Sequence, residues 1–148
     1  MITVIQRVAH AQVTVENREI GKIARGILAL VGVEKNDSEK EADRLLERIL
    51  NYRIFADTSG RMNLSLRDIG GGLLLVPQFT LAADTDSGNR PSFSVAASPE
   101  AGRVMFDYLK HKALSIYQPV QFGEFGADMQ ISLLNDGPVT FRLTVAPR

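Results

Sequence analysis

The chain has 148 residues, of which 45% are hydrophobic and 23% are charged. This composition is typical of a globular protein and excludes a disordered chain. The length allows one hydrophobic core with little left for a second, so we expect a single domain over residues 1–148. No apolar run approaches the roughly 20 residues that cross a bilayer. Because the first charge already stands at Arg7, the start of the chain is not a secretory signal, and no membrane partner is expected.

Acidic and basic residues balance, with 17 Lys and Arg against 17 Asp and Glu. A protein that grips a long stretch of nucleic acid usually has a basic excess, so the balance argues against general duplex binding, and no DNA partner is expected. The charge balance is compatible with contact to a single terminal nucleotide, because stacking and a few hydrogen bonds can supply the specificity of such a contact. The absence of cysteine excludes disulfides and a thiolate nucleophile and fits the cytoplasm, the expected location.

The first part of the chain predicts strands. Residues 2–16 alternate in part between apolar and polar, which indicates a long or bent strand, and residues 17–19 turn it. Residues 20–23 and 26–33 are β-branched or apolar and continue the sheet, which predicts a hairpin. The second of these segments is apolar enough to be buried on both faces.

A helix follows at Ser38, which forms a capping box with Glu41. Its apolar positions recur at helical spacing and predict the buried face. They are Ala42, Leu45, Leu46, Ile49 and Leu50. Residues 53–56 then resemble a short strand, and a turn cluster at 57–60 leads to residues 62–64.

Three glycines at 70–72 precede a short apolar run at 73–76, which predicts a central strand. Without a following Gly-Lys-Ser/Thr the glycines are interpreted as a turn and given no function. Residues 82–97 form a polar loop. Ser98 is a good N-cap with Pro99 at the first helical position, which predicts a second helix. Its apolar stripe is Ala101, Met105, Leu109, Ala113 and Ile116.

Pro119 ends this helix, and residues 120–122, 129–134 and 139–145 are strand-like, with a turn at 135–138 between the last two. About seven strands and two helices predict an α+β fold. We expect a single domain with a curved, partly barrel-like mixed β-sheet and two main helices packed outside, because a sheet of this many strands tends to curl.

The inventory of reactive side chains is small. The chain has two histidines, His10 and His111, and neither is paired with a nucleophile along the sequence, which argues against a Ser-His-Asp triad. Zinc wants three or four ligands drawn mainly from Cys and His, so no metal site and no cofactor are expected. An enzyme with this inventory would rely on backbone donors, as in hydrolysis of an activated ester, where each donor to a developing oxyanion contributes on the order of 10²–10³ in rate.

Two segments, Pro77-Gln78-Phe79-Thr80-Leu81 and Asn135-Asp136-Gly137-Pro138-Val139-Thr140, together resemble the signature pair of the D-aminoacyl-tRNA deacylases. The likeness extends over nearly the whole chain. It includes Ile5-Gln6-Arg7-Val8, Gly32-Val33-Glu34, Arg53-Ile54-Phe55, Met62-Asn63-Leu64-Ser65, Arg90-Pro91-Ser92-Phe93 and Phe125-Gly126-Ala127-Asp128-Met129-Gln130. One departure is Pro77, since that family usually has serine there, so a mechanism that depends on this hydroxyl is not expected.

The resemblance implies hydrolysis of the ester that links a D-amino acid to the 3′ end of tRNA. The catalytic segment would act mainly through backbone donors and pocket lining. It comprises Gln78, Phe79, Thr80 and Leu81. Because nothing in the sequence supplies a base, Thr80 is not the expected nucleophile, and the resemblance implicates the 2′-hydroxyl of the terminal adenosine instead. The expected supporting residues are Arg7, Met129 and Asn135.

The resemblance also implies that Gly137 and Pro138 are joined by a cis peptide bond and enter the active site of a partner subunit, which makes the protein a homodimer. Backbone placed there would exclude an L side chain by steric clash, and glycyl esters would escape this filter. Two alternatives from other classes stay open. One is a non-catalytic dimeric nucleic-acid-binding module, and the other is a hydrolase of small free esters or amides.

Overall fold

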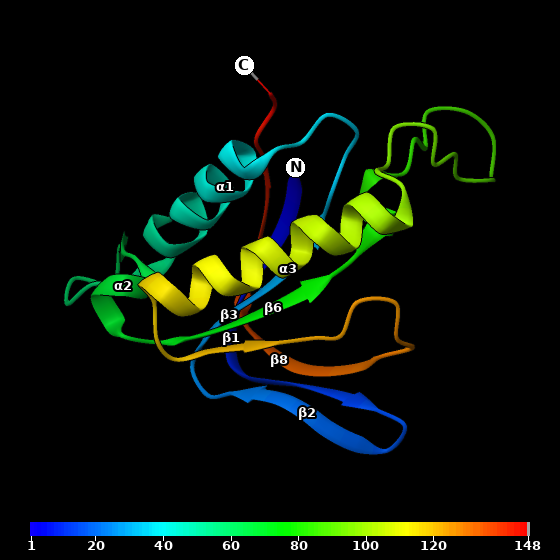
Figure 1. Ribbon diagram of the computed structural model, residues 1–148. Helices are drawn as coiled ribbons and strands as arrows, with labels where there is room; N and C mark the ends of the chain where they lie inside the picture. The colour runs from blue at the N-terminus through cyan, green and yellow to red at the C-terminus, as the bar shows by residue number, and fades with distance from the viewer. Residues whose placement is uncertain (148) are drawn as a thin grey trace.

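A long first strand organises the sheet. The computed structural model describes residues 1–147 (Figure 1). In it β1 (Ile2–Val15) pairs along one edge with β8 (Gln130–Thr144) and along the other with β3 (Gly26–Gly32) and then β2 (Arg18–Ile23). The predicted hairpin is confirmed. Its turn lies slightly earlier than expected, at residues 16–17, both of which have the positive φ that a tight hairpin turn requires.

Two parallel strands extend the sheet beyond β3. β6 (Gly72–Pro77) pairs with β3, and β7 (Val120–Phe122) pairs with β6, which gives the order β2-β1-β3-β6-β7 with β8 on the free edge of β1. The far end of this order returns toward its start. A Cβ added to Gly21 in β2 would lie 2.9 Å from the carbonyl oxygen of Phe122. The expected curved mixed sheet is therefore confirmed.

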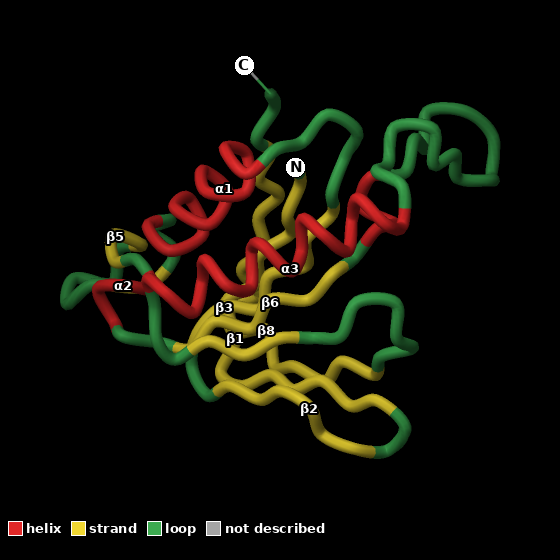
Figure 2. Tube along the Cα trace, viewed as in Figure 1, coloured by secondary structure: helices red, strands yellow, loops and turns green. Residues whose placement is uncertain are grey.

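Two long helices cover one face of the sheet, as expected, and lie against each other (Figures 1 and 2). α1 (Glu39–Asn51) begins at the predicted capping box, where the Ser38 N–H donates to Glu41 Oε2 at 2.7 Å. α3 (Pro99–Ile116) begins at Ser98, whose Oγ accepts from the Ala101 N–H at 3.2 Å. Both helix starts are thus confirmed.

The buried face of α3 differs from the predicted stripe. Leu109 and Ala113 are buried as expected, whereas Ala101 is exposed and Ile116 lies at the surface. The other buried positions are Gly102 and Phe106. A Cβ added to Gly102 would lie 3.2 Å from the ring of Phe125, so the glycine admits an aromatic side chain that the helical period could not reveal.

Several short elements complete the chain. A separate two-stranded sheet joins β4 (Phe55–Ala56) to β5 (Met62–Leu64) (Figure 2). The short helix α2 (Leu66–Ile69) was not predicted, although Ser65 and Asp68 form a second capping box. Its C-cap, Gly70, has φ +61°, so the triple glycine is the expected turn. A 3-10 helix, η1 (Phe79–Ala82), follows β6.

The two central strands are buried on both faces, as predicted for β3. Ile27 and Leu75 face the main core beneath the helices, whereas Leu28 and Leu74 face a second core on the opposite side of the sheet. This alternation follows from the period of two in an extended chain. None of the helices in residues 1–147 combines the length and apolarity needed to span a membrane.

The prediction for the last part of the chain was wrong. Residues 130–144 form one strand, where two strands and a turn were expected. Gln6 lies opposite Thr140 and Val8 opposite Asn135, so residues 136–139 have no partner on β1 and project as a bulge. The same glycine and proline that predict a turn can also be accommodated in a bulge of an edge strand.

Candidate functional site

The first candidate segment leaves the sheet at Pro77, the last residue of β6. The N–H of Gln78 donates to the Val31 carbonyl at 2.7 Å, and its own carbonyl oxygen lies 3.1 Å from the position of a Cβ on Gly32. The backbone of η1 is therefore packed closely on the end of β3. The glycine at 32 permits this approach, because a side chain there would push the segment away.

The side chains of η1 point outward. Phe79 is 61% exposed and its ring lies 5.2 Å from that of Phe93. Thr80 is exposed, and its Oγ1 accepts from Gln78 Nε2 at 2.5 Å. The Leu81 N–H donates to the Gln78 carbonyl at 3.3 Å. Within residues 1–147, the hydrogen-bond partner of the Thr80 hydroxyl is therefore an amide and not a basic group.

The backbone donors at the start of η1 are available. The first N–H groups of a helix have no acceptor within the helix itself. Among the hydrogen bonds of residues 1–147, none uses the N–H of Phe79 or of Thr80. Two neighbouring amides can thus donate to a ligand oxygen.

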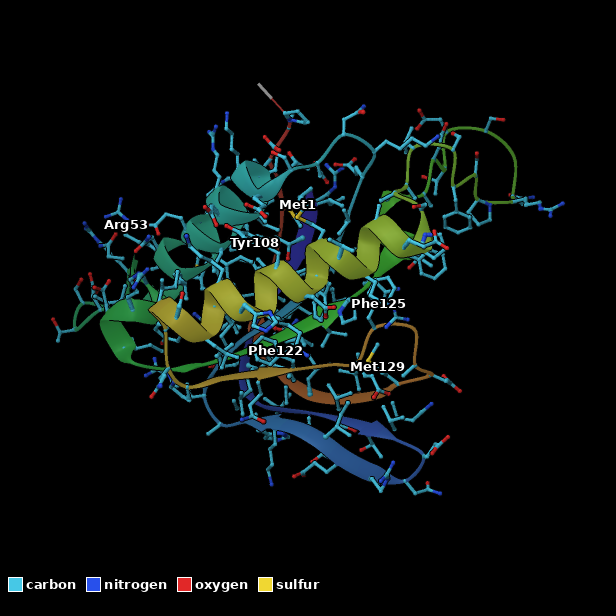
Figure 3. The ribbon with its side chains drawn as sticks, viewed as in Figure 1. Met1, Arg53, Tyr108, Phe122, Phe125 and Met129 are labelled. Carbon is cyan, nitrogen blue, oxygen red and sulfur yellow. The ribbon has the colours of Figure 1, made fainter. Side chains whose placement is uncertain are left out.

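Phe79 borders a pocket of about 450 Å³, whereas Thr80 and Leu81 do not line it. Gln78 and Phe79 form one wall, and the loop between β7 and β8 together with the start of β8 forms the other. The lining residues on that side are Phe125, Gly126, Ala127, Met129 and Ile131. Phe79 and Phe125 also line a smaller apolar pocket of about 70 Å³ that reaches the Phe106 ring. Phe125 and Met129 lie near each other at this end of the molecule (Figure 3).

Met129, an expected supporting residue, stabilises the β7–β8 loop. Its Sδ accepts from the Glu124 N–H at 3.4 Å and would lie 2.9 Å from a Cβ on Gly123. The Cδ of Pro77 also packs near Gly123, at 3.2 Å from the same position. Pro77 therefore serves as an apolar packing group against Gly123.

The second candidate segment is the bulge of β8. Asn135 closes it, because its Oδ1 accepts from the Val139 N–H at 3.0 Å and its Nδ2 donates to Thr140 Oγ1 at 2.9 Å. The Gly137–Pro138 peptide bond at its tip is cis, and both residues are exposed. The tip thus presents backbone to its surroundings.

Arg7 anchors the bulge from β1. Its Nε donates to the Asp136 carbonyl at 2.9 Å, and its Nη1 donates to the Ile54 carbonyl at 2.8 Å. A Cβ on Gly137 would lie 3.1 Å from its Nη2. Two of the expected supporting residues, Arg7 and Asn135, therefore hold the bulge, while Met129 lines the pocket.

The two candidate segments lie apart within one chain. η1 packs against Gly32, which is paired with Ile2 at the start of β1, whereas the bulge lies between Gln6 and Val8. Four to six residues of strand separate these points, which is about 13–20 Å. One chain does not bring its own Gly137 to its own Phe79.

Some features of the site were not predicted. Phe93 and Phe125 lie in segments that resemble the deacylase family, but no role was predicted for them. Loops place both residues at the site, and loops have no periodic pattern from which their position can be predicted. His111 is exposed, with Nδ1 2.7 Å from the Asp107 carbonyl oxygen, and His10 is also exposed. Across residues 1–147 no group of three or more His, Cys, Asp or Glu side chains is arranged to hold a metal ion.

Known proteins resemble this chain along its whole length. The family model of D-Tyr-tRNA(Tyr) deacylase matches residues 4–144. A D-aminoacyl-tRNA deacylase of Thioalkalivibrio sulfidiphilus (strain HL-EbGR7) is 60% identical over 147 residues, which cover 99% of each chain. Among solved structures, c-Myc DNA Unwinding Element Binding Protein has a TM-score of 0.94 at 37% identity and covers 99% of this chain and 100% of its own. A structure described as "a probable eukaryotic D-amino acid tRNA deacylase" shares the fold, with a TM-score of 0.80 at 15% identity over 96% of this chain and 97% of its own.

Proposed function

Because the chain belongs to the D-Tyr-tRNA(Tyr) deacylase family, we propose that it is an enzyme that hydrolyses the ester bond of D-aminoacyl-tRNA and so proofreads chirality. Water adds to the ester carbonyl carbon, the bond to the ribose oxygen breaks, and a free D-amino acid and tRNA are released. The observation that carries this proposal is the pair of unbonded amides of Phe79 and Thr80, in the segment shared with that family, together with the pocket that Phe79 lines.

The amides of Phe79 and Thr80 would bind the ester carbonyl and stabilise the oxyanion that forms on it. Such preorganised donors act without reorganisation at the moment of reaction, and each contributes on the order of 10²–10³ in rate. The Thr80 hydroxyl accepts a hydrogen bond from the Gln78 side-chain amide. An amide nitrogen cannot take the hydroxyl proton, so it cannot activate Thr80 as a base would. A water molecule, assisted by the 2′-hydroxyl of the terminal adenosine, is therefore the proposed nucleophile.

The pocket between Phe79 and Phe125 would accept the terminal nucleoside of tRNA. Unpaired RNA bases are recognised by stacking on aromatic side chains and by contacts to their edges. Phe125 provides an aromatic wall, and Met129 provides an apolar one. We place this activity in the cytoplasm, where aminoacyl-tRNA is consumed.

Selection against L-amino acids would come from Gly137 and Pro138 of a second copy of the chain. Their own Phe79 is out of reach, but both residues are exposed on a bulge that Arg7 and Asn135 hold firmly. Inserted into the partner's pocket, this backbone would occupy the direction that an L side chain needs. Glycine has no side chain to exclude, so glycyl-tRNA would also be cleaved.

One observation favours a second candidate function, nucleic-acid binding without catalysis. The solved relative with a TM-score of 0.94 is named for binding a DNA element. The neutral net charge of this chain argues against tight binding of duplex DNA, because that binding depends on neutralising phosphates. Catalysis on tRNA remains the better-supported function.

The decisive experiment is an ester-hydrolysis assay. The protein is incubated with D-tyrosyl-tRNA, with L-tyrosyl-tRNA and with a free D-tyrosine ester, and the loss of each ester is followed. Rapid loss of the D-tyrosyl-tRNA alone supports the proposal. Equal loss of both enantiomers argues against chiral selection, comparable loss of the free ester indicates a general esterase, and no loss together with retention of RNA on a gel indicates the binding module.

A further inference from the structure

A second groove begins where the candidate site ends. It lies between α3 and β7, has a volume of about 500 Å³, and shares Phe125 with the pocket beside Phe79. Its apolar lining comes from Phe106 of α3 and from Val120 and Phe122 of β7. Phe122 lies beneath α3 (Figure 3). The groove and the site pocket are thus neighbours that share one aromatic ring, and the function proposed above makes no use of the groove.

Two cations lie over the aromatic rings of this groove. The Arg103 Cζ is 4.9 Å from the centre of the Phe125 ring, and the Lys110 Nζ is 5.3 Å from the centre of the Phe122 ring. Both residues come from α3, seven positions apart, so they lie on the same side of the helix, about 10 Å from each other along its axis. Neither takes part in an ion pair among residues 1–147.

Arg103 also reaches the rim of the site pocket. Its Nη2 lies 3.3 Å from the position of a Cβ on Gly126, a residue of the pocket wall. A positively charged group therefore stands where a chain leaving the pocket would enter the groove. A positively charged groove can follow the backbone of single-stranded nucleic acid, because its cations contact successive phosphates. Here each cation is held over an aromatic ring.

We propose that this groove binds the single-stranded nucleotides that precede the terminal adenosine of the tRNA substrate, with Arg103 and Lys110 contacting their phosphates. The inference rests on the proposed deacylase function. It gives the enzyme a way to prefer tRNA over a free ester without a basic surface, which accords with a net charge of zero.

The same groove carries two carboxylates, Asp107 and Glu124, that oppose a polyanion. Both are exposed, so their effect is weakened by solvent and salt. They limit affinity, which suits an enzyme that must release deacylated tRNA. They also supply a test of opposite sign, because neutralising Glu124 strengthens the interaction that neutralising Lys110 weakens.

The experiment compares two substrates, D-tyrosyl-tRNA and the 3′-D-tyrosyl ester of adenosine, which lacks the preceding nucleotides. In the double variant Arg103→Gln, Lys110→Gln, the ratio of kcat/KM on tRNA to kcat/KM on the adenosine ester should fall roughly tenfold. The slope of log kcat/KM for tRNA against log salt should become shallower by about 1.4, for two lost single-strand contacts. Glu124→Gln should raise the ratio about twofold, by removal of an exposed like charge.

Lys40→Gln is the matched control, since Lys40 is an exposed lysine of α1 outside the groove. If the double variant keeps the ratio and salt slope of this control, or if both substrates lose activity equally, the groove does not bind the acceptor end. If the unaltered protein cleaves neither substrate, the deacylase proposal itself is wrong. Circular dichroism of each variant verifies that the fold is intact.

Discussion

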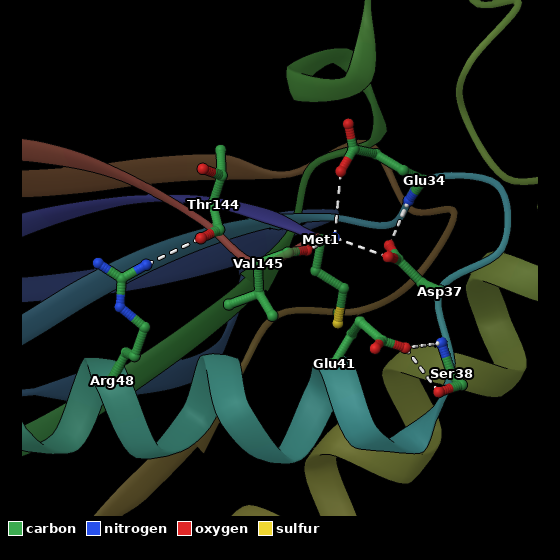
Figure 4. Close-up of polar contacts among 8 residues, drawn as sticks. All are labelled: Met1, Glu34, Asp37, Ser38, Glu41, Arg48, Thr144 and Val145. Atoms are coloured by element: carbon green, nitrogen blue, oxygen red, sulfur yellow. Dashed lines mark hydrogen bonds and ion pairs between the residues drawn. The ribbon is translucent and has the colours of Figure 1, made fainter. Parts of the chain in front are cut away.

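The α-ammonium of Met1 lies 2.7 Å from Oδ1 of Asp37, and both groups are fully buried (Figure 4). The ammonium also donates to the Val145 carbonyl at 2.7 Å and lies 3.1 Å from Glu34 Oε2. Oδ2 of Asp37 accepts from the Glu34 N–H at 2.7 Å. This cluster ties the start of β1 to the loop before α1 and to the segment after β8.

Asp37→Asn should destabilise the fold strongly. Burial raises the pKa of Asp37 above its ordinary value, and the hydrogen bond from the ammonium opposes that shift. Asparagine can still accept from the Glu34 N–H, but it leaves the buried ammonium with less negative charge. Loss of one partner of a buried pair costs about 3 kcal/mol or more in the free energy of unfolding.

Urea denaturation at neutral pH measures this loss. Asp86→Asn is the control, because Asp86 is an exposed carboxylate in the loop between η1 and α3. Its replacement should change the free energy of unfolding by less than about 0.5 kcal/mol. Equal stability of the two variants would mean that the buried ion pair contributes nothing to the fold.

Gly137→Ala should abolish chiral selection or turnover. The φ of Gly137 is +139°, and an added Cβ would lie 2.6 Å from Val139 Cγ2 and 3.0 Å from the Val139 nitrogen. The tip of the bulge must therefore move, and the backbone proposed to exclude L side chains moves with it. We expect kcat/KM on D-tyrosyl-tRNA to fall at least about tenfold, since misplacement by 1 Å can cost 10²-fold.

Gly60→Ala separates this effect from backbone strain. Gly60 also has a positive φ, +82°, but no atom lies within 4 Å of an added Cβ. This control should lose about 1 kcal/mol of stability and keep its activity on both enantiomers. Deacylation by Gly137→Ala at the control's rate and selectivity would refute the role assigned to the bulge.

Thr80→Ala should retain most of its activity. The proposed contribution of this residue is its N–H, which alanine keeps, whereas its hydroxyl only accepts from Gln78 Nε2. We expect kcat/KM on D-tyrosyl-tRNA within about fivefold of the unaltered protein, far from the loss of about 10⁴ or more that follows removal of a true nucleophile. Single-turnover deacylation measures it, and an inactive but folded variant would identify the Thr80 hydroxyl as the nucleophile.

The sequence predicted the parts of the fold that have a regular period or a local signal. The capping box at Ser38 and the N-cap at Ser98 each fixed the start of a helix. The apolar runs that became β3 and β6 were correctly predicted as buried strands. Such signals act within a few residues, so they can be recognised without the rest of the chain.

Features that depend on distant residues were harder to predict. The bulge of β8 is held in part by Arg7, more than 120 residues earlier in the chain, which donates to the Asp136 carbonyl. Gly102 is buried because Phe125 comes to lie against it. The roles proposed for Thr80 and Gly137 come from resemblance to a known family, since spacing alone carries no information about which backbone amides remain free.

Asp57 should make stability depend on acid pH. Its carboxylate accepts from Asn63 Nδ2 at 2.9 Å, from the Ser59 N–H at 2.9 Å and from the Arg61 N–H at 3.0 Å. These bonds, that from Asn63 foremost, lower the pKa of Asp57 from 3.8 to about 2. Between these values the unfolded chain binds more protons than the folded one, so the stabilisation is complete above pH 3.8 and is lost as the pH falls toward 2.

Asp57→Asn removes the titrating group, so its free energy of unfolding should fall less steeply than that of the unaltered protein between about pH 4 and pH 2. Asn63→Ala removes the largest single cause of the shift and should give an intermediate slope. Urea denaturation at several pH values measures the slopes, with Asp86→Asn as the control for an exposed carboxylate in a loop. If Asp57→Asn and Asp86→Asn have equal slopes, the hydrogen bonds around Asp57 do not favour its ionised form in solution.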